Sequence, residues 1–590
     1  MCGIIAGIAE TNITPILMKG LSALEYRGYD SAGIGVLDGQ KPLQLARNLS
    51  GVSSLKQQVE QQHIQGHIGI AHTRWATHGQ PSVENAHPHL SSNRVAVVHN
   101  GIIENHQALH ENLQENGYIF NSQTDSEVIA HLIHFNLGST KDFLSALLKA
   151  LKQLKGNFAL AILDLQDPSH LYLTANQSPL IIGMADNYCI AASDMLAFNQ
   201  DVTQQVFPQD QQLAIIHNNH VDIKDFAGQS TQYQIQPIST QQPVIDQDLM
   251  EGTYMLKEIH EQPKVLTNLC QYYHHASPDP LRCLHHREIQ QIHLIGCGSS
   301  YHAACIASNW FESALKIPTQ AYIASEYRYG PGLVPPNTIA VFLSQSGETA
   351  DTLGALSVAK GLDYLNCYSI CNQPHSSLVR HCDATFPLLA GPEIGVASTK
   401  AFLAQLFVLY AIVGAINPTS NPWMEHTHPM PQLVESVIKL DAEIQQLADQ
   451  LLAYQQIILI GRGILYPVAL EGALKLKELT YLHCHAYPAG ELKHGPLALI
   501  DEKTPVIALM SDDEASQKIQ GNIEEIRSRK GQVFTLHHGQ SEGIQLPSSP
   551  THLTPFTFSV ALQMLAYHLA KRKDLNVDRP RNLAKSVTVE

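Results

Sequence analysis

Cys2 is the first residue of the chain whose type and position suggest catalytic chemistry. A residue as small as cysteine permits removal of Met1, which would leave Cys2 with both a thiol and a free α-amine. With a pKa of about 7.7–8.0, such an amine can act as the general base for the adjacent nucleophile. By itself Cys2 is weak evidence, because the second residue of most proteins has no catalytic role. The residues that follow it decide the interpretation.

Several downstream residues are suited to binding a free amino acid and cleaving its side-chain amide. Arg74 offers a planar, bidentate partner for an α-carboxylate, and Asp125 offers an anion for an α-ammonium. Asn100 and the backbone N–H of Gly101 could stabilise the oxyanion of a tetrahedral intermediate. A glycine at that position lets the backbone approach closely. Together with Cys2, these groups predict a site that hydrolyses an amide.

The motifs around these residues resemble the N-terminal-nucleophile glutaminase domain of glutamine amidotransferases, over residues 2–235. The motifs are Cys2-Gly-Ile-Ile-Ala-Gly, Leu24-Glu-Tyr-Arg-Gly-Tyr-Asp-Ser-Ala-Gly, His72-Thr-Arg-Trp-Ala-Thr-His-Gly, His99-Asn-Gly-Ile-Ile-Glu-Asn and Thr124-Asp-Ser-Glu. The resemblance implies a four-layer αββα fold, Cys2 as the nucleophile, and an oxyanion hole at Asn100 and Gly101. It implies that the residues contacting glutamine are Arg74, Thr77, His78 and Asp125, and it associates Trp75 with gating between two active sites. One departure is Gln123, where the family commonly carries an acidic residue.

A second group of candidate residues lies in the other half of the chain and is suited to binding a phosphate. Ser344-Gln-Ser-Gly-Glu-Thr follows an apolar run and opens a predicted helix, whose amino-terminal N–H groups and hydroxyls form an anion site. A Ser/Thr-rich turn can also be only a helix cap. Ser299-Ser300 and Val396-Ala-Ser-Thr-Lys provide further hydroxyls, and such clusters at the ends of parallel strands fit a phosphate pocket.

Residues suited to proton transfer and imine formation follow later in the chain. Lys475 and Glu478 are three residues apart and share one face of a predicted helix, a spacing that an ordinary surface salt bridge would also show. Lys585, in the closing segment, could form a Schiff base with a ketose, although such a tail could also be disordered.

The elements that must position these residues change in character along the chain. Short β-type runs dominate the first 240 residues, for example 68–73, 95–99, 158–163 and 171–175. Helical periodicity appears over 127–135 and 143–154, so we expect a layered α+β domain. Beyond about residue 250, strands and helices alternate, which predicts parallel sheets covered by helices.

The second half also contains an internal repeat. Ile295-Gly-Cys-Gly matches Ile460-Gly-Arg-Gly at a shift of 165 residues (460 − 295), and the same shift carries Gly330-Pro331 onto Gly495-Pro496. Two separated motifs in one register predict two copies of an α/β domain. The predicted division is a glutaminase-like domain at 1–235, a polar linker at 236–250, two α/β domains at 251–420 and 421–575, and a tail at 576–590.

This half resembles the tandem sugar-isomerase domains of the glutamine:fructose-6-phosphate aminotransferase family, and the resemblance extends to the closing Ser586-Val-Thr-Val-Glu. It implies glutamine and fructose 6-phosphate as substrates, a homodimer, and no metal or redox cofactor, since the ketose carbonyl is its own electrophile. It implies that the sugar-phosphate site is lined by Ser300, Ser344, Gln345, Ser346, Thr349, Val396 and Ser398. It also implies that His494 helps to open the sugar ring, from its own or a neighbouring subunit, and that Lys585 forms the imine. Glu478 would move a proton between C1 and C2, with help from Lys475.

Composition excludes several other classes of partner. The net charge of −16 (37 − 53) argues against nucleic acid and anionic membranes. The 10 cysteines form no CxxC pair and predict a reduced, cytoplasmic protein. The apolar stretch 401–416 is shorter than the roughly 20 residues of a membrane span, so we expect a buried helix. The adjacent pairs His274-His275 and His285-His286 point in different directions and make poor metal sites.

Other functions remain as alternatives. One is a glutamine amidotransferase with another phosphorylated acceptor, for which no pyrophosphate-binding or nucleotide-binding glycine-rich loop is present. A regulator that only senses sugar phosphates would need neither Cys2 nor Lys585, and a peptidase or acylase would leave the second half unexplained. Because ammonia released into neutral water becomes ammonium, which has no nucleophilic lone pair, we also expect a protected path between the two sites.

Overall fold

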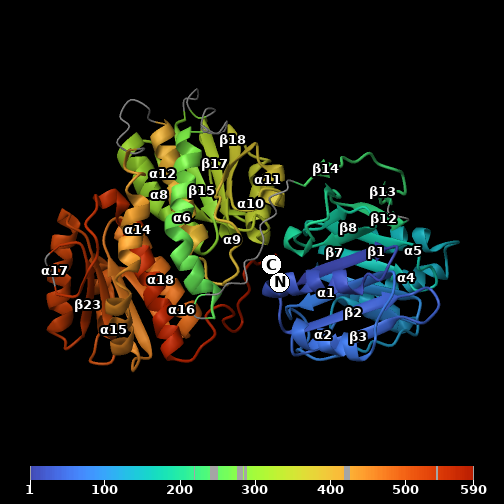
Figure 1. Ribbon diagram of the computed structural model, residues 1–590. Coiled ribbons are helices and arrows are strands. Elements are labelled where there is room, and N and C mark those ends of the chain that lie inside the picture. Colours follow the sequence, from blue (N-terminus) through green and yellow to red (C-terminus); the bar gives the residue numbers. More distant parts are fainter. Residues whose placement is uncertain are drawn as a thin grey trace. The chain divides into compact units, whose positions relative to one another are not determined.

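The computed structural model describes residues 2–217, 220–238, 250, 252–275, 284, 289–416, 425–539 and 542–588. The chain divides into two compact units, residues 1–245 with 584–590 and residues 246–583 (Figure 1). Of the predicted linker at 236–250, residues 239–249 lie outside the described residues.

The first unit contains two antiparallel sheets. The eight-stranded sheet has the order β14-β11-β9-β10-β1-β4-β2-β3, and the six-stranded sheet has the order β13-β12-β8-β7-β6-β5. The strands of the first sheet are β1 (Gly3–Ala9), β2 (Ser31–Leu37), β3 (Gln44–Asn48), β4 (Ile68–Arg74), β9 (Ile181–Met184), β10 (Tyr188–Ala192), β11 (Gln204–Val206) and β14 (Gln236–Pro237). Those of the second are β5 (His89–Ser91), β6 (Val95–Ile103), β7 (Gly156–Asp164), β8 (Leu171–Asn176), β12 (Gln212–His217) and β13 (His220–Asp225).

Helices cover the outer face of each sheet. The helices of this unit are α1 (Thr14–Ala23), α2 (Val52–Gln61), α3 (His106–Glu115), α4 (Glu127–Leu137) and α5 (Phe143–Leu151). Three apolar cores lie between the layers. The first lies between α1, α2 and the first sheet, the second between the two sheets, and the third between the second sheet and α4 and α5. In α5 the apolar residues recur every three or four positions and face the sheet, and Asp142 caps its amino terminus by accepting from Ser145 N–H. The predicted αββα fold is confirmed.

The second unit contains two five-stranded parallel sheets, with the orders β16-β15-β17-β18-β19 and β21-β20-β22-β23-β24. The strands of the first are β15 (Gln291–Gly296), β16 (Thr319–Ile323), β17 (Thr338–Ser344), β18 (Asn366–Cys371) and β19 (Ala384–Pro387). Those of the second are β20 (Gln456–Gly461), β21 (His483–Pro488), β22 (Val506–Met510), β23 (Val533–His537) and β24 (Ile544–Gln545). Every residue of β17 is buried, as expected for a parallel strand covered on both faces. The predicted parallel sheets are confirmed.

The internal repeat corresponds to two copies of the same βα arrangement. β15 and β20 begin 165 residues apart (456 − 291), the shift seen in the sequence, and the helices α8 (Ser299–Leu315) and α16 (Leu465–Thr480) follow them. The two copies share one hydrophobic core, to which both sheets and several long helices contribute. These helices are α6 (Tyr254–His275), α12 (Lys400–Ile416), α14 (Met430–Ile438), α15 (Asp441–Leu451) and α18 (Thr554–Arg572).

The longest apolar stretch of the sequence forms α12. Nearly all of its side chains are buried, including Gln405, so the prediction of a buried helix is confirmed. Among the described residues, no helix combines the length and the apolar character that crossing a bilayer requires.

Candidate functional site

Cys2 lies immediately before β1 and is partly buried. Its Sγ is 3.2 Å from the backbone N of Trp75, which donates to it, and 3.5 Å from the Trp75 carbonyl oxygen. Burial raises the pKa of the Cys2 thiol above its ordinary value, although the positive charges of the chain amino terminus and Arg74 oppose the shift. At neutral pH the thiol is therefore protonated and needs a base to become a nucleophile.

The side chain of Asn100, near the end of β6, is directed at Cys2. Asn100 Nδ2 donates to the Cys2 carbonyl oxygen at 3.0 Å. The Nε2 atom of His72 lies 3.0 Å from both Asn100 Oδ1 and the His99 carbonyl oxygen. Because both partners are acceptors, we assign the proton of His72 to Nε2. Burial lowers the pKa of His72 to about 3, so this neutral tautomer holds the Asn100 amide with its NH₂ group towards Cys2.

Gly101 occupies a position that only glycine fits. Its φ is +121°, and a Cβ atom there would lie 1.9 Å from the Asn157 carbonyl oxygen on the neighbouring strand β7. Gly101 directly follows Asn100, whose side chain reaches the Cys2 carbonyl oxygen, and its place in an oxyanion hole stays a prediction.

The predicted partners of a bound amino acid lie around the same thiol. Arg74 is buried at the end of β4 and donates to the carbonyl oxygens of His78, Gly79 (3.0 Å) and Gln80 (3.4 Å). Asp125 is buried beyond β6, and its Oδ2 accepts from the Ile103 N–H at 2.8 Å. The positive charge of Arg74 lowers the pKa of the Cys2 thiol and the negative charge of Asp125 raises it, so both groups act electrostatically on the thiol.

The other residues predicted to contact glutamine lie on the loop after β4. Thr77 is exposed and its hydroxyl is 3.4 Å from His78 Nδ1. The His78 ring meets His106 at 5.1 Å, and the Trp75 ring meets Tyr29 edge-on at 5.4 Å. Trp75 and His78 are partly buried, and the roles of all three residues stay predictions.

In the second unit, four of the predicted phosphate residues, Ser344, Gln345, Ser346 and Thr349, belong to the end of β17 and the turn that leads to α10 (Ala350–Ala359). Ser344 Oγ accepts from the Gly347 N–H at 2.9 Å and lies 3.4 Å from Thr349 Oγ1. Ser346 Oγ accepts from the Glu348 N–H at 3.2 Å, and the Gln345 carbonyl faces Asn372 N–H. The turn therefore presents hydroxyls and N–H groups at the carboxyl end of a parallel strand, where anions bind in open α/β sheets.

The tight bend of this turn depends on Gly347. Its φ is +67°, and a Cβ atom there would lie 2.0 Å from Ser376 Oγ. Ser300, in the first turn of α8, is held by Gln405 of α12, whose Nε2 donates to Ser300 Oγ at 3.0 Å. The sequence offered no signal for Gln405 except its being the one polar residue within the apolar stretch.

Lys475 and Glu478 belong to a cluster around the buried Lys475 ammonium, not to the fully exposed salt bridge that their spacing also allowed. Lys475 Nζ lies 2.7 Å from Glu478 Oε2 and 3.5 Å from Glu471 Oε1, and the Lys475 side chain is 2% exposed. Glu471 in turn accepts from Ser299 Oγ and is paired with His302 Nδ1, both at 2.8 Å. The cluster therefore joins α16 of the second copy to the amino terminus of α8 in the first.

The electrostatics of this cluster keep Lys475 charged. Burial alone would lower the pKa of Lys475, but Glu478 and Glu471 outweigh it and raise that pKa above its ordinary value. Burial would likewise raise the pKa of Glu471, but Lys475, His302 and Ser299 lower it. Lys475 is thus a hydrogen-bond donor and positive charge rather than a base. Sequence reasoning missed Glu471 and His302, although Glu471 stands four residues before Lys475 on the same helix face.

The remaining predicted residues are more dispersed. Val396 N–H donates to the Asp578 carbonyl oxygen at 3.1 Å, and Ser398 Oγ donates to Glu393 at 3.4 Å, both just before α12. His494 ends the 3₁₀ helix η3 (Ala489–His494) and is exposed, without a hydrogen bond to the Lys475 cluster in the described part of the chain. Lys585 belongs to the segment 584–590, which groups with the first unit.

No group of three or more His, Cys, Asp or Glu side chains is arranged to hold a metal ion among the residues that the structure describes. His274, one of the paired histidines, is hydrogen-bonded through Nε2 to Thr427 Oγ1 at 2.7 Å. His285 and His286 lie outside the described residues.

Comparison with known proteins gives matches along the chain. Residues 72–200 match a glutamine amidotransferase domain, and residues 286–415 and 450–571 match the SIS domain. A glutamine--fructose-6-phosphate aminotransferase [isomerizing] from Pseudomonas putida is 43% identical over 617 aligned positions, covering 100% of both chains. The protein of the same name from Legionella pneumophila (strain Paris) is 43% identical over 609 positions, again over 100% of both chains. The solved C-terminal domain of glucosamine-fructose-6-phosphate aminotransferase from Francisella tularensis is 38% identical, with a TM-score of 0.54, and covers 56% of this chain and 100% of that one.

Proposed function

The chain belongs to the glutamine--fructose-6-phosphate aminotransferase family, and we propose that it converts fructose 6-phosphate and glutamine into glucosamine 6-phosphate and glutamate. The observation that carries this proposal is the 43% identity with such an enzyme over the full length of both chains. A protein with another acceptor would share the glutaminase half, but not the sugar-isomerase half.

In the glutaminase half, Cys2 attacks the side-chain amide carbon of glutamine once its thiol proton has been removed by the freed α-amine. The amide oxygen becomes an oxyanion, which accepts from Asn100 Nδ2 and Gly101 N–H. The pairing of Asn100 Oδ1 with His72 supports this role, because it keeps the donor end of the amide towards Cys2. Ammonia leaves as the thioester forms, and water then releases glutamate.

Recognition of glutamine would depend on its two α-groups. Arg74 pairs with the carboxylate and Asp125 with the ammonium, while Thr77 and His78 complete the pocket. Trp75 gates the path from this site. The buried, opposite charges of Arg74 and Asp125 beside the thiol support this assignment.

In the isomerase half, the phosphate would be held by hydroxyls and N–H groups of the turn after β17 and of the α8 amino terminus. Its residues are Ser300, Ser344, Gln345, Ser346, Thr349, Val396 and Ser398. His494 assists ring opening, and the Lys585 amine then forms an imine with the ketose carbonyl as water leaves. Ammonia attacks this imine carbon and displaces the Lys585 amine. Glu478 carries the proton from C1 to C2. The buried contact of Lys475 with Glu478 supports this step, because a fixed ammonium orients the carboxylate.

We further propose a cytoplasmic homodimer, in which the exposed His494 serves the sugar site of the neighbouring subunit. The nine described cysteines are all free, which fits a reducing compartment. Sedimentation at low and high protein concentration would test the dimer.

The proposed function is tested by product analysis of the purified chain with glutamine and fructose 6-phosphate, beside a Cys2→Ala variant. We expect equal amounts of glucosamine 6-phosphate and glutamate from the wild type. The variant should make no amino sugar from glutamine but should still isomerise the sugar phosphate. Release of glutamate without amino sugar would refute the acceptor, and absence of both products with Met1 removed would favour a sugar-phosphate sensor.

A further inference from the structure

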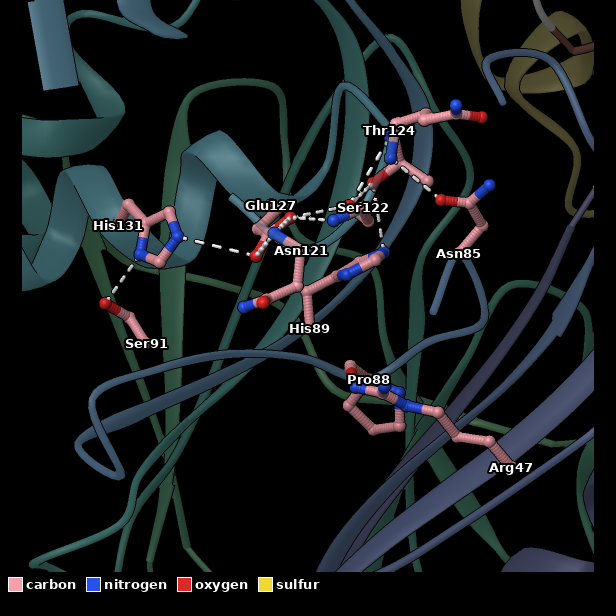
Figure 2. Close-up of polar contacts among 11 residues, drawn as sticks. Arg47, Asn85, Pro88, His89, Ser91, Asn121, Ser122, Thr124, Glu127 and His131 are labelled. Carbon is pink, nitrogen blue, oxygen red and sulfur yellow. Dashed lines mark hydrogen bonds and ion pairs between the residues drawn. The ribbon is translucent and has the colours of Figure 1, made fainter. Parts of the chain in front are cut away.

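The loop before α4 turns around a buried carboxylate, that of Glu127, which is 3% exposed (Figure 2). Glu127 Oε1 and Oε2 accept from Asn121 N–H at 3.0 and 3.1 Å. Oε2 also accepts from the N–H and the hydroxyl of Ser122, both at 2.7 Å. His131, one turn along the helix, lies 3.5 Å from Oε1. The carboxylate therefore holds the beginning of the loop that leads to Asp125.

Hydrogen bonds continue from this carboxylate to the residue before Asp125. Ser122 Oγ lies 3.0 Å from Thr124 Oγ1, which in turn lies 3.1 Å from Nε2 of the buried His89. His89 is the first residue of β5, so the loop is attached to the second sheet at the position directly before Asp125. Figure 2 shows Glu127, Ser122, Thr124 and His89 joined in this way.

One side-chain amide connects this loop to the loop that Arg74 holds. Asn85 Oδ1 accepts from the Gln123 N–H at 2.8 Å, and Asn85 Nδ2 donates to the Gln80 carbonyl oxygen, also at 2.8 Å. The Gln80 carbonyl is one of the acceptors of Arg74. Because the contact uses the backbone of Gln123, the departure of this side chain from the family pattern leaves it intact.

Glu127 is charged in this setting. Burial alone would raise its pKa, but the contact with His131 and the hydrogen bonds from Asn121 and Ser122 outweigh burial and lower that pKa to about 2. Charge-assisted hydrogen bonds of this kind are roughly twice as strong as neutral ones. These hydrogen bonds stabilise a loop that lies outside the apolar cores. Ligand-binding groups on such a loop depend on hydrogen bonds, rather than on core packing, to stay in position.

We propose that Glu127, acting with Asn85, is a positioning residue of the glutamine site: it fixes the Asp125 loop and, through Asn85, sets that loop against the loop anchored by Arg74. The two groups that take the α-ammonium and the α-carboxylate are then held at one spacing before glutamine arrives. The inference rests on the proposed roles of Arg74 and Asp125 in binding glutamine.

The test is Glu127→Gln in the full-length chain, assayed by glutamate release with fructose 6-phosphate present. The amide keeps the size of the side chain but replaces one acceptor oxygen by an NH₂ group that faces the donors of Asn121 and Ser122. We expect KM for glutamine to rise about tenfold, the loss of one charge-assisted bond, with kcat within about twofold. Glutamate carries the same α-groups, so its inhibition constant should rise by the same factor. Glu115→Gln, an exposed glutamate at the end of α3, is the matched control.

Two readouts separate positioning from simple damage to the fold. Alkylation of Cys2 by iodoacetamide needs neither α-group partner and should keep its wild-type rate, as should isomerisation of fructose 6-phosphate. A fall in kcat with KM unchanged, or a KM no higher than that of Glu115→Gln, would overturn the proposal.

If Glu127→Gln slows the alkylation of Cys2, Asn85→Ala decides the question. A raised KM for glutamine with normal alkylation in that variant supports the proposal, and an unchanged KM overturns it. The assay measures glutamate release, which does not depend on which molecule accepts the ammonia. The test therefore remains valid even if fructose 6-phosphate is not the acceptor.

Discussion

Lowering the pH from 7.5 to 5.5 should reduce the free energy of unfolding of the first unit, because its buried histidines stay neutral when folded. The contribution of one such residue can be worked out for His72. Its pKa is about 3 in the folded chain, because burial disfavours the imidazolium, against 6.5 when exposed. As the pH falls below 6.5 the unfolded chain takes up a proton that the folded chain does not, so stability present above pH 6.5 is lost progressively down to about pH 3. At pH 5.5 the loss from one such histidine is about 1.4 kcal/mol.

Other histidines of the first unit add to this effect. Burial lowers the pKa of His89 to about 3 as well, and it lowers those of His87 and His99. The His72 and His87 rings are stacked 4.0 Å apart, so protonation of one also disfavours protonation of the other. Together, His72 and His89 should cost about 3 kcal/mol at pH 5.5.

The assay is hydrogen exchange, followed by mass spectrometry, of peptides from β4 and β6 in the full-length chain at the two pH values, after correction for intrinsic rates. His72→Gln keeps an N–H donor near Asn100 but cannot titrate, so between pH 7.5 and 5.5 it should lose about 1.4 kcal/mol less protection than the wild type. The exposed His67→Gln should behave as the wild type does. Equal losses in the wild type and His72→Gln would refute the assignment of a neutral, buried His72.

Three further predictions concern the two sites. Asn100→Ala should lower kcat for glutamate release by about 10²–10³, the usual cost of one oxyanion donor, and a smaller change in steady-state kinetics would remove Asn100 from that role. Glu471→Ala should destabilise the second unit by about 3–5 kcal/mol in chemical denaturation, because it leaves Lys475 buried with one partner fewer, whereas removal of Glu435 from its exposed pair with Lys439 should cost less than about 1 kcal/mol. With unlabelled glutamine and excess ¹⁵N-ammonium, the amino sugar should carry little ¹⁵N by mass spectrometry, and efficient incorporation would contradict a protected ammonia path.

Much of the architecture was predictable because its signals are local. Short runs of β-branched and apolar residues anticipated β4, β6, β7 and β8, and a three- and four-residue apolar period anticipated α4 and α5. The 165-residue repeat anticipated two similar α/β copies, since the same strand and glycine turn must recur to build the same βα unit. Helix α12 was predictable as buried because a stretch that is apolar except for Gln405, and too short for a bilayer, has no other favourable environment.

Only those site residues that belong to recognisable motifs could be predicted from the sequence. Their types suit amide hydrolysis, which led to the prediction that Cys2, Arg74, Asn100 and Asp125 belong to one site. Their supporting partners could not be found in this way, because His72 and Asn85 are polar residues without a distinctive spacing to the groups they hold. The contact between Asn85 and Gln123 spans 38 residues and depends on how two loops fold back on the sheet.

The sequence by itself determined the fold class, the repeat and the family, because periodicity, register and motif spacing are properties of the chain order. The tertiary structure alone decided that Lys475 is buried rather than on the surface, and that Glu471 meets Ser299 and His302, which lie 172 and 169 residues away. Helix spacing defines which residues share a face, but only the packing of α16 against α8 determines what that face meets. The low dielectric of the shared core then turns an ordinary i, i+3 pair into a fixed ammonium–carboxylate contact.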